Sequence, residues 1–144
     1  MGITNALKDE KKKDVVIDDA VKLVDAEVAS KSGISGFAVK KGYDAIKSIK
    51  PGFVREAVEK LLPEMAEKIE PIWDEGKKAG NAKGHLEKNK SRVADALLSV
   101  TDDKVQRAKS GVVRSTYSML RGSAKKNVEE AVPRLADLIQ KHDQ

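Results

Sequence analysis

The sequence predicts an all-α protein: one compact domain, residues 1–144, built as a bundle of about six helices. Apolar residues recur at steps of three and four along most of the chain, which is the period of helices that bury one face. Charged residues of mixed sign make up 35% of the chain and suit the outer faces of many helices. A chain of 144 residues has the size of one domain and buries about two thirds of its unfolded surface.

Residues 51–73 carry the longest apolar stripe and predict the central helix of the bundle. The charged residues of this segment fall on the opposite side, and the only tryptophan closes it. Pro63 interrupts the stripe and predicts either a kink or two helices that meet end to end. Pro71 is expected to end the second piece. The apolar positions are Phe53, Val54, Ala57, Val58, Leu61, Leu62, Met65, Ala66, Ile69 and Ile72.

Two helices are predicted before this segment, after a short helical turn near the N-terminus. The first covers about residues 16–30 and has an acidic polar face. The second covers about residues 34–49, with Phe37 among the residues expected to point inward. Gly36 and Gly42 lie within it, and each disfavours a helix by about 1 kcal/mol relative to alanine. A close crossing with another helix is one reason for glycines at these positions.

The segment after Trp73 is predicted to be a linker followed by three helices. Residues 76–84, GKKAGNAKG, contain no large apolar side chain and predict the linker. A helix is expected at 85–100, and residues 101–103 resemble an N-cap for the next helix. That helix is interrupted at Gly111 in one interpretation. The last helix is expected to begin after Gly122.

The two halves of the chain show similar short blocks. Lys-Ser-Gly-Ile at 31–34 resembles Lys-Ser-Gly-Val at 109–112. One interpretation is a pseudo-repeat of two three-helix halves, residues 15–75 and 86–141. The other is chance matching, because the shared residue types are common in this chain.

Several observations concern the cellular setting. The chain has no cysteine, which excludes disulfides and thiolate metal sites and suits a reducing compartment. No apolar run is long enough to cross a bilayer, and the first residues lack a signal-peptide core. The N-myristoylation motif requires Ser or Thr where this chain has Ala6. We therefore expect a cytoplasmic protein without a membrane partner.

Recognisable catalytic patterns are absent from the sequence. It contains no nucleophile elbow, Walker loop, HExxH motif or dinucleotide-binding glycine fingerprint. Its two histidines, His85 and His142, are expected at the surface. An acid pair in a cleft stays open, because Asp and Glu are plentiful. We predict no cofactor, no metal site and no catalytic residue, and the sequence leans away from an enzyme.

Positive charge is concentrated in the second half of the chain. Residues 1–75 carry 13 basic and 15 acidic residues, whereas residues 76–144 carry 15 basic and 8 acidic residues. Residues 104–126 contain seven basic residues and no acidic residue. On one unbroken helix, the three arginines of this segment would form one stripe, because they are spaced seven residues apart. Two of the lysines would extend this stripe. We name these five residues the basic set and predict an anion-binding face: Lys104, Arg107, Arg114, Arg121 and Lys125.

A second interpretation of the basic set is neutralisation within the protein or by another copy of the chain. Tyr117 is the only aromatic residue nearby, so a platform for stacking nucleic-acid bases is missing. A helix break at Gly111 would also dissolve the stripe. The acidic residues predicted to face the basic set lie in and just after the central helix: Glu59, Glu67, Glu70 and Asp74.

Four blocks together resemble a family of small all-helical bacterial proteins of unknown function. The blocks are SKSGISG at 30–36, IKPGFV at 49–54, VADALLSVTD at 93–102 and NVEEAVPRL at 127–135. The resemblance covers nearly the whole chain. It implies one conserved architecture and a bacterial cytoplasmic setting, and it implies no activity, cofactor or catalytic residue.

The sequence therefore assigns no specific biochemical function. Its first hypothesis is a non-enzymatic interaction or structural protein, with helix faces that self-associate or bind a protein partner. The alternative is a weak binder of nucleic acid or another polyanion through residues 104–126. An enzyme ranks third.

Overall fold

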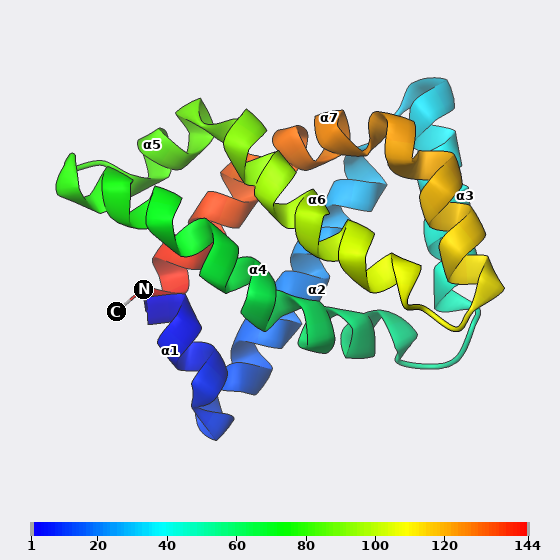
Figure 1. Ribbon diagram of the computed structural model, residues 1–144, viewed down its shortest axis with the longest axis horizontal. Helices are drawn as coiled ribbons and strands as arrows, with labels where there is room; N and C mark the ends of the chain where they lie inside the picture. The colour runs from blue at the N-terminus through cyan, green and yellow to red at the C-terminus, as the bar shows by residue number, and fades with distance from the viewer. Residues whose placement is uncertain (1, 144) are drawn as a thin grey trace.

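Seven helices and no strand make up the computed structural model, which describes residues 2–143 apart from the side chain of Ser35 (Figure 1). The all-α prediction is confirmed, and the predicted number of about six helices is close to seven. The helices are α1 (Gly2–Lys8), α2 (Glu10–Ser30), α3 (Gly33–Lys47), α4 (Phe53–Lys78), α5 (Ala82–Lys88), α6 (Lys90–Gln106) and α7 (Gly111–His142). No helix among residues 2–143 is both long and apolar enough to cross a bilayer.

Helix α4 contains the predicted central segment and buries its apolar face as expected. Ile69, Ile72 and Trp73 are each less than 5% exposed. Pro63 and Pro71 both lie inside this one helix, so the expectation that Pro71 ends it is wrong, as is the two-helix alternative at Pro63. Both prolines are on the exposed side of α4. Burial of the opposite face therefore outweighs the unfavourable effect of a proline in a helix, about 3 kcal/mol each.

The predicted linker at 76–84 is wrong, because most of this segment is helical and Gly76 serves close packing. Helix α4 continues to Lys78, and α5 begins at Ala82 after one turn. Gly76 is buried, and a Cβ atom there would lie 2.7 Å from the Ala82 Cα and from the His85 Cβ. Glycine at 76 therefore lets α5 fold back against the end of α4, so the residue marks a contact between helices.

Helix boundaries in the second half differ from the predicted ones. Residues 101–103 lie inside α6 and do not cap a new helix. The interruption at Gly111 is confirmed: Gly111 begins α7, and the Ser110 hydroxyl accepts a hydrogen bond from the Val113 N–H group. The break expected at Gly122 is wrong, because α7 continues through it to His142. Gly122 does not have a positive φ, and a single glycine weakens a helix of this length without ending it.

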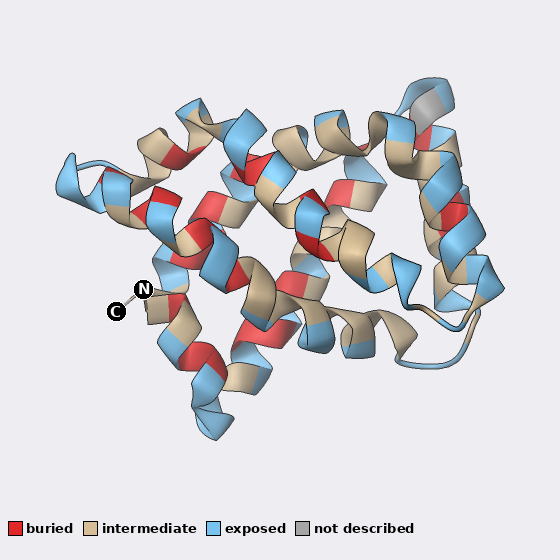
Figure 2. Ribbon diagram, in the orientation of Figure 1, coloured by how far each residue is buried: buried red, intermediate tan, exposed pale blue. Residues whose placement is uncertain are grey.

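Helix α3 lies apart from the main core. The cluster of buried apolar residues draws on α1, α2, α4, α5, α6 and α7, and no described residue of α3 belongs to it (Figure 2). Phe37 is 61% exposed, so its predicted inward position is wrong. The predicted close crossing is confirmed at Gly42, where a Cβ atom would lie 2.9 Å from Leu120 and 3.0 Å from Thr116 of α7.

The pseudo-repeat stays a prediction. The two Lys-Ser-Gly blocks have the same role, because Gly33 begins α3 and Gly111 begins α7. The halves differ elsewhere, since residues 48–52 separate α3 from α4 whereas α7 has no corresponding break.

Candidate functional site

An apolar channel of about 420 Å³ lies between α3 and the helices α2, α6 and α7. Its wall along α7 runs from Val113 to Val128, which on an α-helix is a length of about 22 Å. Val24 of α2, Val39 of α3 and Leu98 of α6 line the other sides. The channel is therefore elongated and partly open to solvent, and aliphatic side chains form most of its wall.

The sequence explains why space remains beneath α3. Gly42 brings α3 into contact with α7 at Thr116 and Leu120, so the two backbones approach closely at that level. The side chains beside this contact are too short to fill the remaining space, as at Val39 and Ala124. Helix α3 thus covers the channel without being packed into the core.

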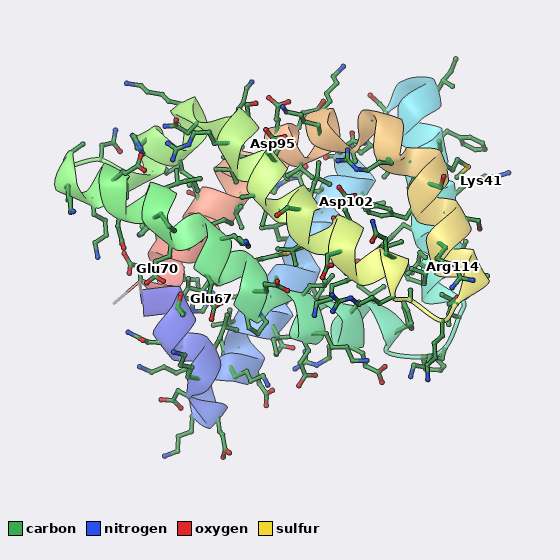
Figure 3. The ribbon with its side chains drawn as sticks, in the orientation of Figure 1. Lys41, Glu67, Glu70, Asp95, Asp102 and Arg114 are labelled. Carbon is green, nitrogen blue, oxygen red and sulfur yellow. The ribbon has the colours of Figure 1, made fainter. Side chains whose placement is uncertain are left out.

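A polar cluster lies where α6 meets α7 beside the channel. We call it the Asp102 cluster: Thr101, Asp102, Tyr117 and Arg121. Arg121 donates from Nε and Nη2 to the two carboxylate oxygens of Asp102 at 2.9 and 3.0 Å, and the Tyr117 hydroxyl also donates to Asp102. The Thr101 hydroxyl lies 2.7 Å from the Tyr117 hydroxyl oxygen. Thr101, Tyr117 and Arg121 line the channel, and Asp102 lies on α6 next to α7 (Figure 3).

Charge is balanced within the Asp102 cluster. The hydrogen bond from Arg121, followed by that from Tyr117, lowers the pKa of Asp102 below its ordinary value. Burial and the neighbouring Asp102 raise the pKa of Tyr117 above its ordinary value. At neutral pH the cluster therefore contains a carboxylate, a guanidinium and a protonated phenol.

The structure separates the basic set into different surroundings. Residues 107–110 connect α6 to α7, so the five side chains do not share one helix stripe. Arg107 pairs with Asp103 at 3.4 Å, and Arg114 donates to the backbone oxygen of Ala108. Only Arg121 lines the channel.

The two lysines of the basic set pair with carboxylates of neighbouring helices. Lys104 lies 3.7 Å from Glu64, and Lys125 lies 3.2 Å from Asp95. Glu64 is the only residue of the central segment that pairs with the basic set within residues 2–143. Sequence reasoning did not name Glu64 as a partner. Glu59, which it did single out, pairs with Lys13 at 3.5 Å. Glu67 and Glu70 lie on α4 towards α1, whereas Arg114 lies at the opposite end of the molecule (Figure 3).

The two histidines have one carboxylate partner each. His85 Nε2 lies 3.1 Å from Glu75, which also binds Arg92, and His142 Nε2 lies 2.7 Å from Asp19. Both histidines are half-buried. Within the part of the chain that the structure describes, no group of three or more His, Asp or Glu side chains is arranged to hold a metal ion.

Sequence reasoning missed the channel because its walls come from four helices. The sequence pattern predicted ordinary core positions, each within its own helix, for Val24, Val28 and Leu98. The one local signal was the glycine pair in α3, which indicated a close helix crossing. Glycine patterns alone do not show whether the space beside such a crossing is filled.

Comparisons with known proteins identify a family and no characterised relative. No match was found among curated proteins or among solved structures. The sequence profile of DUF6918, described as a family of unknown function, matches residues 3–143. Because the match spans nearly the whole chain, this protein belongs to the DUF6918 family.

Proposed function

We propose that this protein is a non-enzymatic binding protein for a small apolar molecule, which it holds in the channel beneath α3. The observation that carries the proposal is the channel itself. Its volume of about 420 Å³ lies within the roughly 300–1,000 Å³ of small-molecule sites. An apolar ligand in the channel would gain dispersion contacts with its walls and remove their apolar surface from water.

The proposal agrees with the sequence-based hypothesis of a non-enzymatic protein. It replaces the protein partner of that hypothesis with a small molecule. The channel volume of about 420 Å³ is too small to enclose a helix of a partner protein, whose diameter with side chains is about 10–12 Å. Its polar wall residues also favour binding over catalysis. The Arg121 guanidinium is engaged by Asp102, and the raised pKa of Tyr117 keeps its hydroxyl protonated at neutral pH.

The test is binding of the neutral fluorescent probe N-phenyl-1-naphthylamine. We expect enhanced fluorescence with the wild-type protein and at least about tenfold weaker binding after Ala124→Phe, because the added ring occupies the channel. Ser118→Phe adds the same ring on the exposed side of α7 and is expected to leave binding unchanged.

Circular dichroism shows whether each variant remains folded, and Val39→Phe fills the same channel from α3 if Ala124→Phe unfolds. The proposal is wrong if the wild-type protein does not bind the probe. It is also wrong if a folded channel-filling variant binds as tightly as the Ser118→Phe control.

Polyanion binding through residues 104–126 remains the alternative. Each member of the basic set has an acceptor within the protein, so a polyanion would compete with these contacts. The alternative requires salt-dependent retention on heparin that is lost in the Arg107/Arg114/Arg121 triple alanine variant. Self-association and a cytoplasmic location are also retained as proposals. Light scattering over a concentration series tests the first, and localisation of a tagged chain tests the second.

A further inference from the structure

The channel has one polar side chain that combines a fixed position, a positive charge and access to solvent. Arg121 lines the channel with its aliphatic stem, because the channel wall is almost entirely apolar, and its side chain is 42% exposed. It therefore lies at the boundary between the apolar space and the solvent. Asp102 holds the guanidinium plane through two hydrogen bonds, which limits its rotation.

Arg121 retains donors that its internal partner does not use. A guanidinium has five N–H groups, and Asp102 accepts from Nε and Nη2 only. The remaining N–H groups are available to a second acceptor in the same plane. Planar, paired donors suit a carboxylate or a phosphate better than they suit a neutral hydroxyl group.

The chain segment that contains Arg121 carries an excess of basic residues. Residues 104–126 contain seven basic residues and no acid. The carboxylates that pair with the basic residues of this segment are Glu64, Asp95, Asp102 and Asp103, so positive charge remains in excess. Lys125 lies one helical turn after Arg121 and extends the positive charge along α7.

We infer that the ligand is a single-chain amphiphile with an anionic head group, whose hydrocarbon tail occupies the channel and whose head binds Arg121. This inference rests on the proposed function and assigns its ligand class. The elongated channel of about 420 Å³ has a volume that suits one extended hydrocarbon chain. The aliphatic wall favours a saturated tail, and Arg121 supplies the only cationic group among the residues that line the channel.

The test measures displacement of N-phenyl-1-naphthylamine by dodecanoate, dodecanol and dodecyltrimethylammonium, all below their micelle concentrations. The three ligands share a tail length and differ in the charge of the head. We expect dodecanoate to bind about tenfold more tightly than dodecanol, because a charged acceptor strengthens its hydrogen bonds to Arg121. The cationic ligand should bind most weakly. Among carboxylates, affinity should rise about fourfold per methylene from octanoate until the channel is full.

Arg121→Gln is expected to reduce the affinity for dodecanoate to about that for dodecanol, and to weaken dodecanoate binding far more than dodecanol binding. Arg114→Gln is the matched control, because Arg114 lies on the same helix but does not line the channel. The double variant Arg121→Gln/Asp102→Asn avoids an unpaired carboxylate if the single variant is unstable. Arg121→Lys should retain part of the preference for dodecanoate.

The outcomes separate this inference from the proposed function. If dodecanol binds as tightly as dodecanoate, or if Arg121→Gln weakens both equally, the head-group assignment is wrong while the apolar channel stands. If the probe binds but none of the three ligands displaces it, the amphiphile inference is wrong while the proposed function stands. If the probe itself does not bind, the proposed function fails as well. Co-sedimentation with anionic phospholipid vesicles that requires Arg121, without dodecanoate binding, would assign Arg121 to a membrane surface and would overturn the inference.

Discussion

At the scale of single residues, Lys31 connects helices that are distant in the sequence. It caps the end of α2, and its ammonium group lies 2.9 Å from Glu130 of α7 and 3.5 Å from Glu27 of α2. Glu27 also accepts from Arg134 at 2.8 Å. Lys31 and Glu27 are both only 9% exposed, so these contacts offset the cost of burying the two side chains.

We predict that Lys31→Met lowers the free energy of unfolding, measured by urea denaturation. The expected loss is about 2 kcal/mol, less than the roughly 3–5 kcal/mol typical of a broken buried pair, because Glu27 keeps Arg134. Lys40→Met is the control, since Lys40 is exposed on α3, and it should change stability by less than about 0.5 kcal/mol. Equal effects of the two substitutions would show that the Lys31 contacts contribute little.

At the scale of elements, α3 is the helix least attached to the core. It lies between Gly33 and Gly52, which both have positive φ, and it contributes no described residue to the buried apolar cluster. Few buried contacts imply a low free energy of local opening. We therefore predict that the amides of α3 exchange hydrogen faster than those of α4, and that a bound channel ligand slows the exchange in α3. Equal protection in the two helices would contradict this.

A disulfide can lock α3 onto α7 and test whether α3 moves when a ligand enters. A Cβ atom at Gly42 would lie 3.0 Å from the Thr116 Cγ2, which suits a bond between Gly42→Cys and Thr116→Cys. The natural chain has no cysteine, so no other disulfide competes. We expect the oxidised protein to bind N-phenyl-1-naphthylamine at least about tenfold more slowly than the reduced protein. Identical association rates would mean that the ligand enters without movement of α3, and each single cysteine variant serves as a control.

At the scale of the whole molecule, the two ends of the chain lie together at the end of the bundle away from α3 (Figure 1). The carboxylate of Asp143 accepts hydrogen bonds from the Gly2 N–H group at 2.7 Å and from Trp73 Nε1 at 2.8 Å. Lys141 and His142 both contact Asp19 of α2. These contacts join α1, α2, α4 and α7 at the end of the molecule away from the channel.

The contacts at the chain ends predict a loss of stability in acid. Burial acts to raise the pKa of Asp143, but hydrogen bonds from Trp73, Gly2 and Lys77 outweigh it and hold the pKa below its ordinary value. A carboxylate whose pKa is lower in the folded state stabilises the fold above its unfolded pKa. This contribution is therefore present above about pH 4 and is lost as the pH falls through the folded pKa.

We predict that Asp143→Asn makes the unfolding free energy less dependent on pH below about pH 4, because it removes one carboxylate whose pKa is lowered by folding. Urea titrations followed by the fluorescence of Trp73, the only tryptophan, measure this dependence. Asp44→Asn on the exposed face of α3 is the control and should retain the wild-type dependence. A wild-type pH dependence in Asp143→Asn would contradict the assignment.

The sequence by itself determined the helical class and most helix positions, because the period of an apolar stripe is a local property of the chain. The buried face of α4 and the possible helix interruption at Gly111 followed from residues close in sequence, whereas the last helix was expected to begin only after Gly122. The family resemblance was likewise carried by contiguous blocks and is confirmed by the match over residues 3–143.

Only the tertiary structure decided which apolar faces meet and how completely they fill the space between them. Phe37 belongs to an apolar stripe yet is exposed, because no other helix covers that side of α3. Gly76 is typical of a linker in the sequence but is a packing contact in the fold. Arg121 looked like one member of a basic stripe, and its place beside an apolar channel depends on four helices whose separation no local pattern specifies. Packing depends on the joint shape of side chains far apart in the chain, which is why the channel could not be predicted from the sequence.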